Sequence, residues 1–502
     1  MSTPSDPQYL ALRETHCAGL LLVGERAYKF KKPVDFGFLD FSTAEKRAHA
    51  CRREVELNRR FSPDVYLGVA DLALPDGHHE AVVVMRRMPD DRRLATLVVN
   101  GTDVRDDLRR LAHQLATAHA GASRAGVIDT EVGLDRLRAR WDASFDQVLS
   151  LTPRILDRPV VTDVKWLTHR FLDGRGALFR QRIDEGCAVD GHGDLMADDV
   201  FCLADGPRAL DCLEFDDQLR YLDRIDDACF LAMDLERLGN PELGAAFLGW
   251  YAEFSGDPAP PSLVHHYIAY RAFVRAKVAG LRADQGAPGA VEARLFADQA
   301  RRHLEAGAVT LTLVGGAPGT GKSTVAGALA DRLGMVVLSS DRIRKELAGL
   351  DPETSAASNL HSGIYDAEHT DRTYAEMLRR ARLLLGLGES VVLDASWGTA
   401  QHRAAARRTA ADTLSDLREL CCSAANDLAV RRIAARAGSD HLVSDADASV
   451  ATALAVERAP WPEASLVDTE VGVTESVDAA AGLVRPVRLH EPRRLRSMME
   501  PD

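Results

Sequence analysis

Residues 311–325 read LTLVGGAPGTGKSTV, a short apolar run followed by a glycine-rich turn and the start of a helix. The stretch matches the pattern G-x-x-x-x-G-K-[ST], with Gly316, Gly321, Lys322 and Ser323 at its fixed positions. Glycines allow the backbone to turn so tightly that successive N–H groups point at phosphate oxygens, and the following helix presents its positive end to the same anion. The stretch therefore predicts a phosphate-binding loop between a strand and a helix.

This loop defines a predicted nucleotide site. We expect Lys322 to reach the β- and γ-phosphates and the Ser323 hydroxyl to bind Mg²⁺. The residues expected to hold the nucleotide are Gly316, Ala317, Pro318, Gly319, Thr320, Gly321, Lys322, Ser323 and Thr324.

Around the loop, apolar strands alternate with helices, which predicts a parallel sheet. In such a sheet, ligands bind at the carboxyl ends of the strands. Asp341 follows the second strand in MVVLSSD, and Asp394 follows a later strand in ESVVLDASW. We expect Asp394 to hold Mg²⁺ through water, and the alternative is that it only caps the strand end.

Asp341 and Arg344 are three residues apart, so a helix starting there places both side chains on one face. A carboxylate can take the proton of an acceptor hydroxyl, and a guanidinium can hold an anionic substrate with two hydrogen bonds. The alternative for Asp341 is an N-cap of the following helix. Downstream, a helix carries Arg431, Arg432 and Arg436, either as a lid over the transferred phosphoryl group or as a solvated basic face.

Together, the motifs GAPGTGKST, SSDRIRKEL, VVLDASW and RRIAAR resemble the P-loop kinase family that includes gluconate kinase, chloramphenicol phosphotransferase, the zeta toxins and polynucleotide kinases. Such sequences are often labelled AAA-type ATPases. The resemblance implies ATP and Mg²⁺ as cofactors, Asp341 as the base that activates the hydroxyl, and Arg344 as a substrate-binding residue. It implies Arg432 or Arg436 as the lid arginine. No clear sensor or arginine-finger pattern of a ring motor is evident, which favours phosphoryl transfer over mechanical work.

The first half of the chain carries the triplet HGD, which ends at Asp194, and a second aspartate, Asp211, after an apolar pair. In protein-kinase-like chemistry one aspartate orients the acceptor hydroxyl and the second holds Mg²⁺ on the nucleotide phosphates. A strand lysine, Lys29 or Lys31, and a helix glutamate, Glu54, precede them in the order of such a site. The alternative is that both aspartates only stabilise turns.

This half resembles the aminoglycoside phosphotransferase and choline kinase group of protein-kinase-like folds, over residues 9–300. Family members usually have Asn where this chain has Asp199, and the glycine-rich loop expected before Leu20 is missing. A pseudokinase therefore stays an open alternative. The resemblance implies Asp194 as the catalytic residue, Asp199 and Asp211 as metal ligands, and Lys29, Lys31 and Glu54 as nucleotide-site residues.

The chain of 502 residues is too long for one hydrophobic core. We expect a kinase-like domain at 1–300, a P-loop kinase domain at 301–485 and a tail at 486–502. The net charge of −13 argues against nucleic acid or a membrane as a partner, although a local basic groove stays open. Scattered cysteines and the lack of a leader or a long apolar run predict a cytoplasmic protein.

The predicted architecture combines α+β and α/β classes: a two-lobed protein-kinase-like domain, then a P-loop domain with a parallel sheet flanked by helices. The whole chain resembles bacterial two-domain proteins that join these modules. Our leading hypothesis is a phosphotransferase that moves the γ-phosphoryl of ATP to a hydroxyl of a small molecule. Two alternatives stay open, a nucleotide-regulated binding protein with a pseudokinase domain and a nucleic-acid 5′-hydroxyl kinase. The sequence identifies neither the acceptor nor the oligomeric state.

Overall fold

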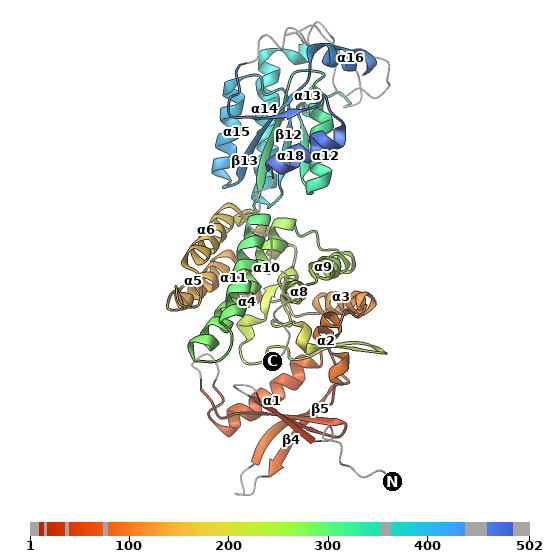
Figure 1. Cartoon of the computed structure of the whole chain (residues 1–502). Coiled ribbons are helices and arrows are strands. Elements are labelled where there is room, and N and C mark those ends of the chain that lie inside the picture. Colours follow the sequence, from red (N-terminus) through yellow and green to blue (C-terminus); the bar gives the residue numbers. More distant parts are fainter. Residues whose placement is uncertain are drawn as a thin grey trace.

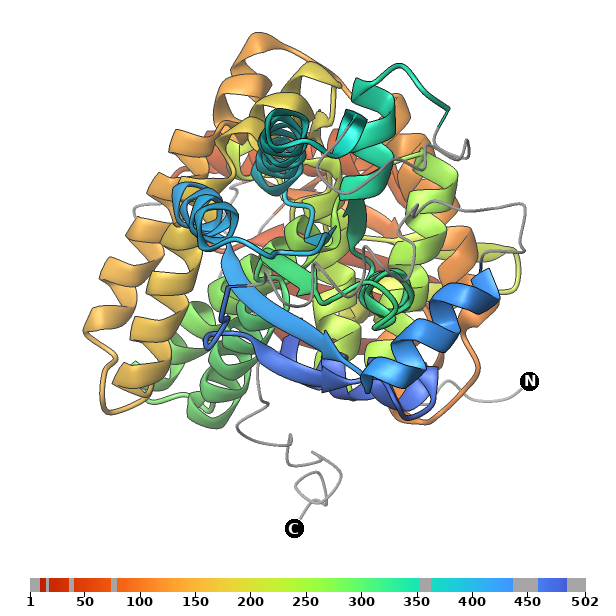
Figure 2. The ribbon, with the colours of Figure 1, turned by 90° about the horizontal axis from the view of Figure 1, so that it is seen from above.

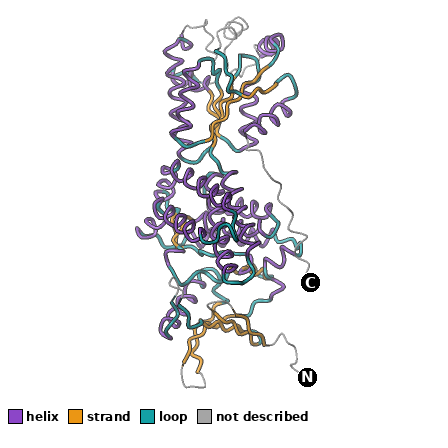
Figure 3. Tube along the Cα trace, turned by 60° about the vertical axis from the view of Figure 1, so that its left-hand side comes forward, coloured by secondary structure: helices purple, strands orange, loops and turns teal. Residues whose placement is uncertain are grey.

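The computed structural model of the chain describes residues 10–14, 18–35, 40–73, 79–351, 363–436 and 459–484. Three parts follow one another along the long axis of the molecule: a small sheet lobe, a helical lobe and an α/β domain (Figure 1). The main sheets lie at the two ends, and most of the helices lie between them (Figure 3). No helix in the described ranges is both long enough and apolar enough to cross a membrane.

The small lobe is a five-stranded antiparallel sheet in the order β1-β2-β3-β5-β4, with helix α1 packed against β4 and β5. Strands β2 and β3 form an antiparallel hairpin around the Gly24-Glu25 turn. The Thr43 hydroxyl caps α1 by accepting a hydrogen bond from the Lys46 amide. The elements are β1 (Leu10–Glu14), β2 (Ala18–Val23), β3 (Arg26–Lys31), α1 (Ala44–Asn58), β4 (Tyr66–Ala73) and β5 (His79–Arg86).

The helical lobe packs around a large apolar core that includes the fully buried rings of Trp141 and Phe145. Two short antiparallel sheets belong to this lobe: the pair β6 with β9, and the hairpin of β7 and β8. The HGD triplet follows β6, and Asp211 follows β8. Its helices are η1 (Asp90–Arg92), α2 (Leu94–Val99), α3 (Arg105–Ala120), α4 (Gly126–Val132), α5 (Leu134–Leu149), α6 (Arg158–Gly174), α7 (Gly176–Asp184), η2 (Ala197–Asp199), η3 (Asp217–Leu219), α8 (Arg224–Arg237), α9 (Pro241–Ser255), α10 (Pro261–Asp284) and α11 (Ala290–Ala306). Its strands are β6 (Ala188–Asp190), β7 (Val200–Leu203), β8 (Gly206–Ala209) and β9 (Tyr221–Asp223).

The α/β domain is a parallel sheet in the order β11-β12-β10-β13-β14, with helices on both faces (Figure 2). Its central strands are apolar on both faces because helices cover both. The strands are β10 (Thr310–Gly315), β11 (Val336–Ser339), β12 (Val391–Asp394), β13 (Asp416–Ser423) and β14 (Ser465–Asp468). The helices are α12 (Lys322–Leu333), α13 (Ser340–Leu347), η4 (Gly363–Tyr365), α14 (Ala367–Gly386), α15 (Ala400–Asp412), α16 (Asn426–Arg436) and α18 (Val473–Val484).

The helical lobe contacts the α/β domain at the amino ends of its strands. Arg175, between α6 and α7, is 1% exposed and donates to the carbonyl oxygen of Thr413 over 2.7 Å. Asp416, the first residue of β13, pairs with Arg170 of α6 at 2.5 Å. The carboxyl ends of these strands therefore face away from the helical lobe. This topology confirms the predicted fold class, while the exact domain boundaries stay predictions.

Candidate active sites

The phosphate loop connects β10 to α12, as predicted. Gly316 and Gly319 have φ angles of +149° and +82°, and a Cβ atom at Gly319 would lie 2.5 Å from the carbonyl oxygen of Ala429. The Thr320 hydroxyl donates to the Ala317 carbonyl over 2.8 Å, which closes the turn. Helix α12 begins at Lys322, so its first amides lie at the end of the loop. This backbone cradle is of the kind that holds phosphate groups.

Asp394 ends β12, and in the strand register it lies opposite Val314 of β10. It is 6% exposed, and its Oδ1 atom is buried without a hydrogen-bond partner. Burial raises the pKa of the Asp394 carboxyl, which Lys322 and the Ser323 hydroxyl lower in part. An unpartnered carboxylate oxygen beside a hydroxyl and an ammonium group fits Mg²⁺, which is bound by one or two protein oxygens together with phosphates and water. Ser323 and Asp394 would hold the metal, and Lys322 would neutralise phosphate charge beside it.

Asp341 is the second residue of α13, and the N-cap of that helix is Ser339. The predicted alternative that Asp341 caps this helix is therefore wrong, because the helix starts one residue before Asp341. The negative charge of Asp341 raises the pKa values of Asp394 and Tyr374, so all three side chains belong to the same edge of the sheet. The role of Asp341 as a base for an acceptor hydroxyl stays a prediction.

Arg344 is only 7% exposed, and its neighbours hold one side of its guanidinium. Its Nη1 atom donates to the Ile364 carbonyl (3.0 Å) and to the Thr370 hydroxyl (3.1 Å), and the group lies over the ring of Tyr365. The buried Nε atom has no hydrogen-bond partner. Arg344 therefore keeps only part of its donor fork for a substrate.

The predicted lid arginines differ in their surroundings. Arg432 donates to the Thr469 carbonyl over 2.7 Å, and one of its nitrogens lies 3.7 Å from the position of a Cβ atom at Gly321, so this side chain reaches the phosphate loop. Arg431 is exposed and pairs with Asp427 one turn earlier, as expected of a solvated face. The side chain of Arg436 lies outside the described residues.

Sequence reasoning missed a set of side chains that supports the segment after Asp394. The Tyr374 hydroxyl accepts a hydrogen bond from the Trp397 amide (3.1 Å) and lies 3.2 Å from the Ser396 hydroxyl. Its ring stacks on His402 at 3.9 Å. Trp397 is fully buried with a φ of +52°, which is strained for a tryptophan. The only sequence pattern that points here is the Trp in DASW, because Tyr374 lies within a long helix far from this strand.

In the first half, the predicted lysine and glutamate residues do meet. Both Lys29 and Lys31 of β3 contact the fully buried Glu54 of α1, at 2.8 Å and 2.6 Å. Lys29 also pairs with Asp211, whereas Lys31 pairs with Glu214. Of the two lysines, Lys29 therefore joins the helix glutamate to the predicted metal aspartate, and Glu214 is a partner that the sequence did not indicate.

Electrostatics fix the charges of this cluster. Burial opposes charge on Lys29, but Asp211 and Glu54 raise its pKa well above the usual value. Burial also opposes charge on Glu54, yet Lys29 and Lys31 keep its pKa below the usual value. In the same way Lys29 lowers the pKa of Asp211 against the effect of burial. The pKa shifts of Lys29, Glu54 and Asp211 therefore all favour their charged forms, whereas burial raises the pKa of Glu214.

Asp227 holds the HGD triplet in place by accepting hydrogen bonds from the amides of His192 (2.6 Å) and Gly193 (2.9 Å). The buried His192 ring forms a hydrogen bond of 3.0 Å with the Leu210 carbonyl, so this histidine has a structural role. Burial raises the pKa of Asp194, which Arg275 lowers and Asp211 raises further.

Burial, Asp211 and Asp194 together raise the pKa of Asp199 well above its usual value. The aspartates at 194, 199 and 211 therefore belong to one neighbourhood. In the described ranges, no three His, Cys, Asp or Glu side chains converge closely enough to hold a metal ion by themselves. Mg²⁺ here would need nucleotide phosphates as further ligands.

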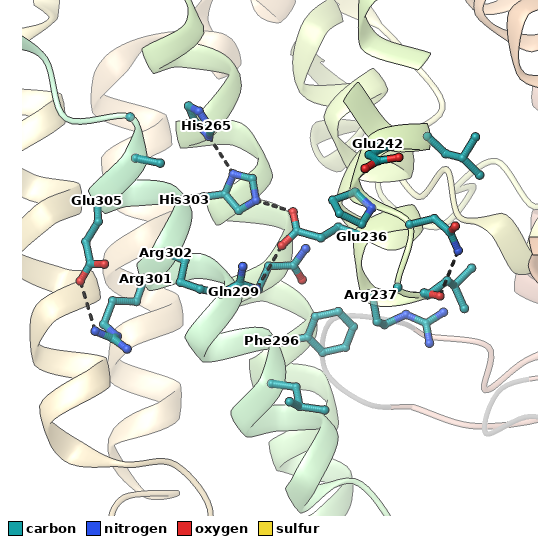
Figure 4. A pocket seen from close by; sticks show the side chains of 18 of the residues that line it. Glu236, Arg237, Glu242, His265, Phe296, Gln299, Arg301, Arg302, His303 and Glu305 are labelled. Atoms are coloured by element: carbon teal, nitrogen blue, oxygen red, sulfur yellow. Dashed lines mark hydrogen bonds and ion pairs between the residues drawn. The ribbon is translucent and has the colours of Figure 1, made fainter. Parts of the chain in front are cut away.

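A cavity of about 2350 Å³ lies apart from both candidate sites, along α11 and the amino ends of β10 and β13. Within it His303 lies between Glu236 and His265, at 2.6 Å and 2.8 Å (Figure 4). The side chains of both candidate active sites are absent from its walls.

A model of a family described as AAA domain matches residues 311–459. Among solved structures, a gluconokinase from Sinorhizobium meliloti 1021 is 18% identical with a TM-score of 0.26, over 35% of this chain and 91% of that chain. The GDP and kanamycin complex of APH(2")-IIia is 18% identical with a TM-score of 0.39, over 60% of this chain and 95% of that chain. The matched domain and the two sites described above support a phosphotransferase in general.

Two mycobacterial proteins match almost the whole chain. Uncharacterized protein Mb2027c of Mycobacterium bovis (strain ATCC BAA-935 / AF2122/97) is 48% identical over 467 residues, which are 93% of this chain and 93% of that protein. Uncharacterized protein Rv2004c of Mycobacterium tuberculosis (strain ATCC 25618 / H37Rv) matches with the same identity and coverage. Because the match runs through both halves, the chain belongs to the same two-domain family as Rv2004c.

Proposed function

We propose that the protein is an ATP- and Mg²⁺-dependent phosphotransferase that moves the γ-phosphoryl group to a hydroxyl of a small molecule. We assign the transfer to the α/β domain in the first place, ahead of the N-terminal half. One observation carries the proposal: the Asp394 carboxyl, whose buried Oδ1 atom has no hydrogen-bond partner, ends β12 within the electrostatic reach of Lys322, Ser323 and Asp341.

Each of these residues has a role that its position permits. The loop amides and Lys322 bind the phosphates, and Ser323 with Asp394 orients the metal. Asp341 takes the proton of the acceptor hydroxyl. The hydroxyl oxygen of the acceptor then forms a bond to the γ-phosphorus, while the bond between the γ-phosphorus and the β–γ bridging oxygen breaks and ADP leaves. Arg432 lies beside the loop, where its charge would stabilise the transferred group. ATP with Mg²⁺ would supply the phosphoryl group.

For the first half we propose a second kinase site or a substrate-selecting domain. The Lys29–Glu54 pair and its contact with Asp211 support nucleotide binding. Asp199 stands where related kinases usually have asparagine, and the glycine-rich loop before Leu20 is missing. These two departures favour a second candidate function for this half, a nucleotide-regulated module without transfer. The overall negative charge makes a nucleic-acid kinase the weaker candidate.

The test is ATP consumption by the full chain with and without a library of hydroxyl metabolites, in Lys322→Ala and Asp194→Ala variants. Arg332→Ala is the matched control, because Arg332 lies in the same helix as Lys322 but pairs with Asp478 on the surface. We expect Lys322→Ala to remove most turnover and Arg332→Ala to leave it unchanged. Unchanged turnover in both Lys322→Ala and Asp194→Ala would refute the proposal that the protein is an enzyme.

Two further measurements separate the alternatives. Calorimetry with a non-hydrolysable ATP analogue favours the regulated module if binding is tight and turnover negligible. Labelling of a 5′-hydroxyl oligonucleotide favours the nucleic-acid kinase.

A further inference from the structure

Helix α10 of the helical lobe packs directly against the HGD loop. Arg271 of this helix donates to the carbonyl oxygen of Gly193 over 3.2 Å, one residue before Asp194. Arg275 lies four residues further along α10, so it occupies the same face one turn away. Arg275 is also the cation with the largest effect on the Asp194 carboxyl. The helix therefore presents Arg275 beside the predicted catalytic carboxylate.

The other cations near this loop already have partners. Arg271 forms two hydrogen bonds of 2.7 Å to Asp226. Lys29 is bound by Glu54 and Asp211. Arg275 is half-buried, and within the described part of the chain it forms neither a hydrogen bond nor an ion pair.

A guanidinium partly removed from water without a partner is costly, because its desolvation is not offset by a hydrogen bond. A ligand that supplies an anionic group would remove this cost. The planar fork of arginine suits a carboxylate or a phosphate ester, which it can bind through two parallel hydrogen bonds.

We propose that Arg275 binds the acceptor of the N-terminal site, and that this acceptor carries a carboxylate or phosphate ester near the hydroxyl it presents to Asp194. The proposal rests on the kinase function proposed for this half. It disfavours polyamine acceptors, because they would place further positive charge beside Arg275. The nucleotide phosphates are a second source of negative charge, but Lys29, which we expect to bind them, comes from the small lobe, whereas Arg275 comes from the helical lobe.

The test is a binding measurement, so it does not depend on turnover. Isothermal titration of the full chain carrying Lys322→Ala uses D-glycerate, glycerol 3-phosphate, sugar acids and sugar phosphates as anionic probes. Choline and kanamycin are the cationic probes. The variants are Arg275→Gln, the charge-preserving Arg275→Lys and the control Arg282→Gln, which removes an exposed arginine from the same helix.

We expect at least one anionic probe to bind. Arg275→Gln should weaken its affinity about tenfold or more, because the hydrogen bond between the guanidinium and the anionic group is lost. Arg275→Lys should retain most of the binding, and Arg282→Gln should leave it unchanged. Melting curves check that each variant is folded.

Three results would overturn the proposal. The first is that no anionic probe binds. The second is that an anionic probe binds equally well to the Arg275→Gln variant. The third is that Arg275→Gln weakens the binding of an ATP analogue but not of the anionic probes. The proposed transferase function fails separately, when the unaltered chain consumes no ATP with any metabolite.

Discussion

Replacement of Glu54 by Gln tests the charged network of the small lobe. Glu54 is fully buried, and its two carboxylate oxygens contact Lys29 and Lys31 at 2.8 Å and 2.6 Å. The variant keeps the shape of the side chain but leaves two ammonium groups with one negative partner fewer. Glu56→Gln is the matched control, because Glu56 lies on the same helix and forms an exposed pair with Arg53.

The size of the effect follows from burial. Breaking a buried ion pair by removing one partner costs about 3–5 kcal/mol, whereas an exposed pair contributes at most about 1 kcal/mol. Since about 1.4 kcal/mol corresponds to a factor of ten, amides of β3 and α1 should exchange roughly 100- to 4,000-fold faster in Glu54→Gln. The control should change exchange by roughly fivefold at most.

The assay is hydrogen exchange followed by mass spectrometry, which reports each segment of this multidomain chain separately. The pKa of Glu54 is held below its usual value, so its contribution is present above the unfolded-state value and is lost as the pH falls through the folded-state value. The difference between the original chain and the variant should therefore shrink under acid conditions. Equal exchange in Glu54→Gln and Glu56→Gln at neutral pH would refute the reasoning.

Three other substitutions give separate predictions. Asp394→Asn should raise the Mg²⁺ concentration required for ATP consumption about 10- to 100-fold. Because the pKa of Asp394 is raised in the original chain, its metal affinity should begin to fall at a higher pH than that of an ordinary aspartate. Gly319→Ala should abolish nucleotide binding at the phosphate loop in calorimetry, since its Cβ would lie 2.5 Å from a carbonyl oxygen of α16, whereas Gly327→Ala, with nothing within 4 Å, should leave this binding unchanged. Arg175→Met should lower the melting temperature, because loss of its charged hydrogen bond to Thr413 costs about 1.5–3 kcal/mol; an unchanged melting curve would contradict this.

The sequence predicted those parts of the site that local backbone conformation decides. The loop from Gly316 to Gly321 is predictable because only glycine tolerates its left-handed φ angles and close contacts. Strand ends after apolar runs are also local features, which is why Asp341 and Asp394 were found. The start of α13 was placed too late, because serine and aspartate in SSD compete for the cap.

Contacts between distant segments could not be predicted. Lys29 and Lys31 lie on one face of β3, since side chains alternate along a strand, and the sequence cannot tell which of them meets Asp211 from a loop 182 residues away. Tyr374 gives no local pattern, because its role depends on the fold of the segment after Asp394. Strand β1 is short and was not expected at all.

The junction built on Arg175 determines how the two halves can cooperate. Because the helical lobe covers the amino ends of the parallel sheet, one candidate catalytic centre opens at the distal tip of the molecule and the other between the two lobes of the opposite end (Figure 1). A metabolite made at one centre would have to diffuse through bulk solvent to reach the other. Under the proposed function, the fusion would supply the two centres in equal copy number while keeping them at opposite ends of the molecule.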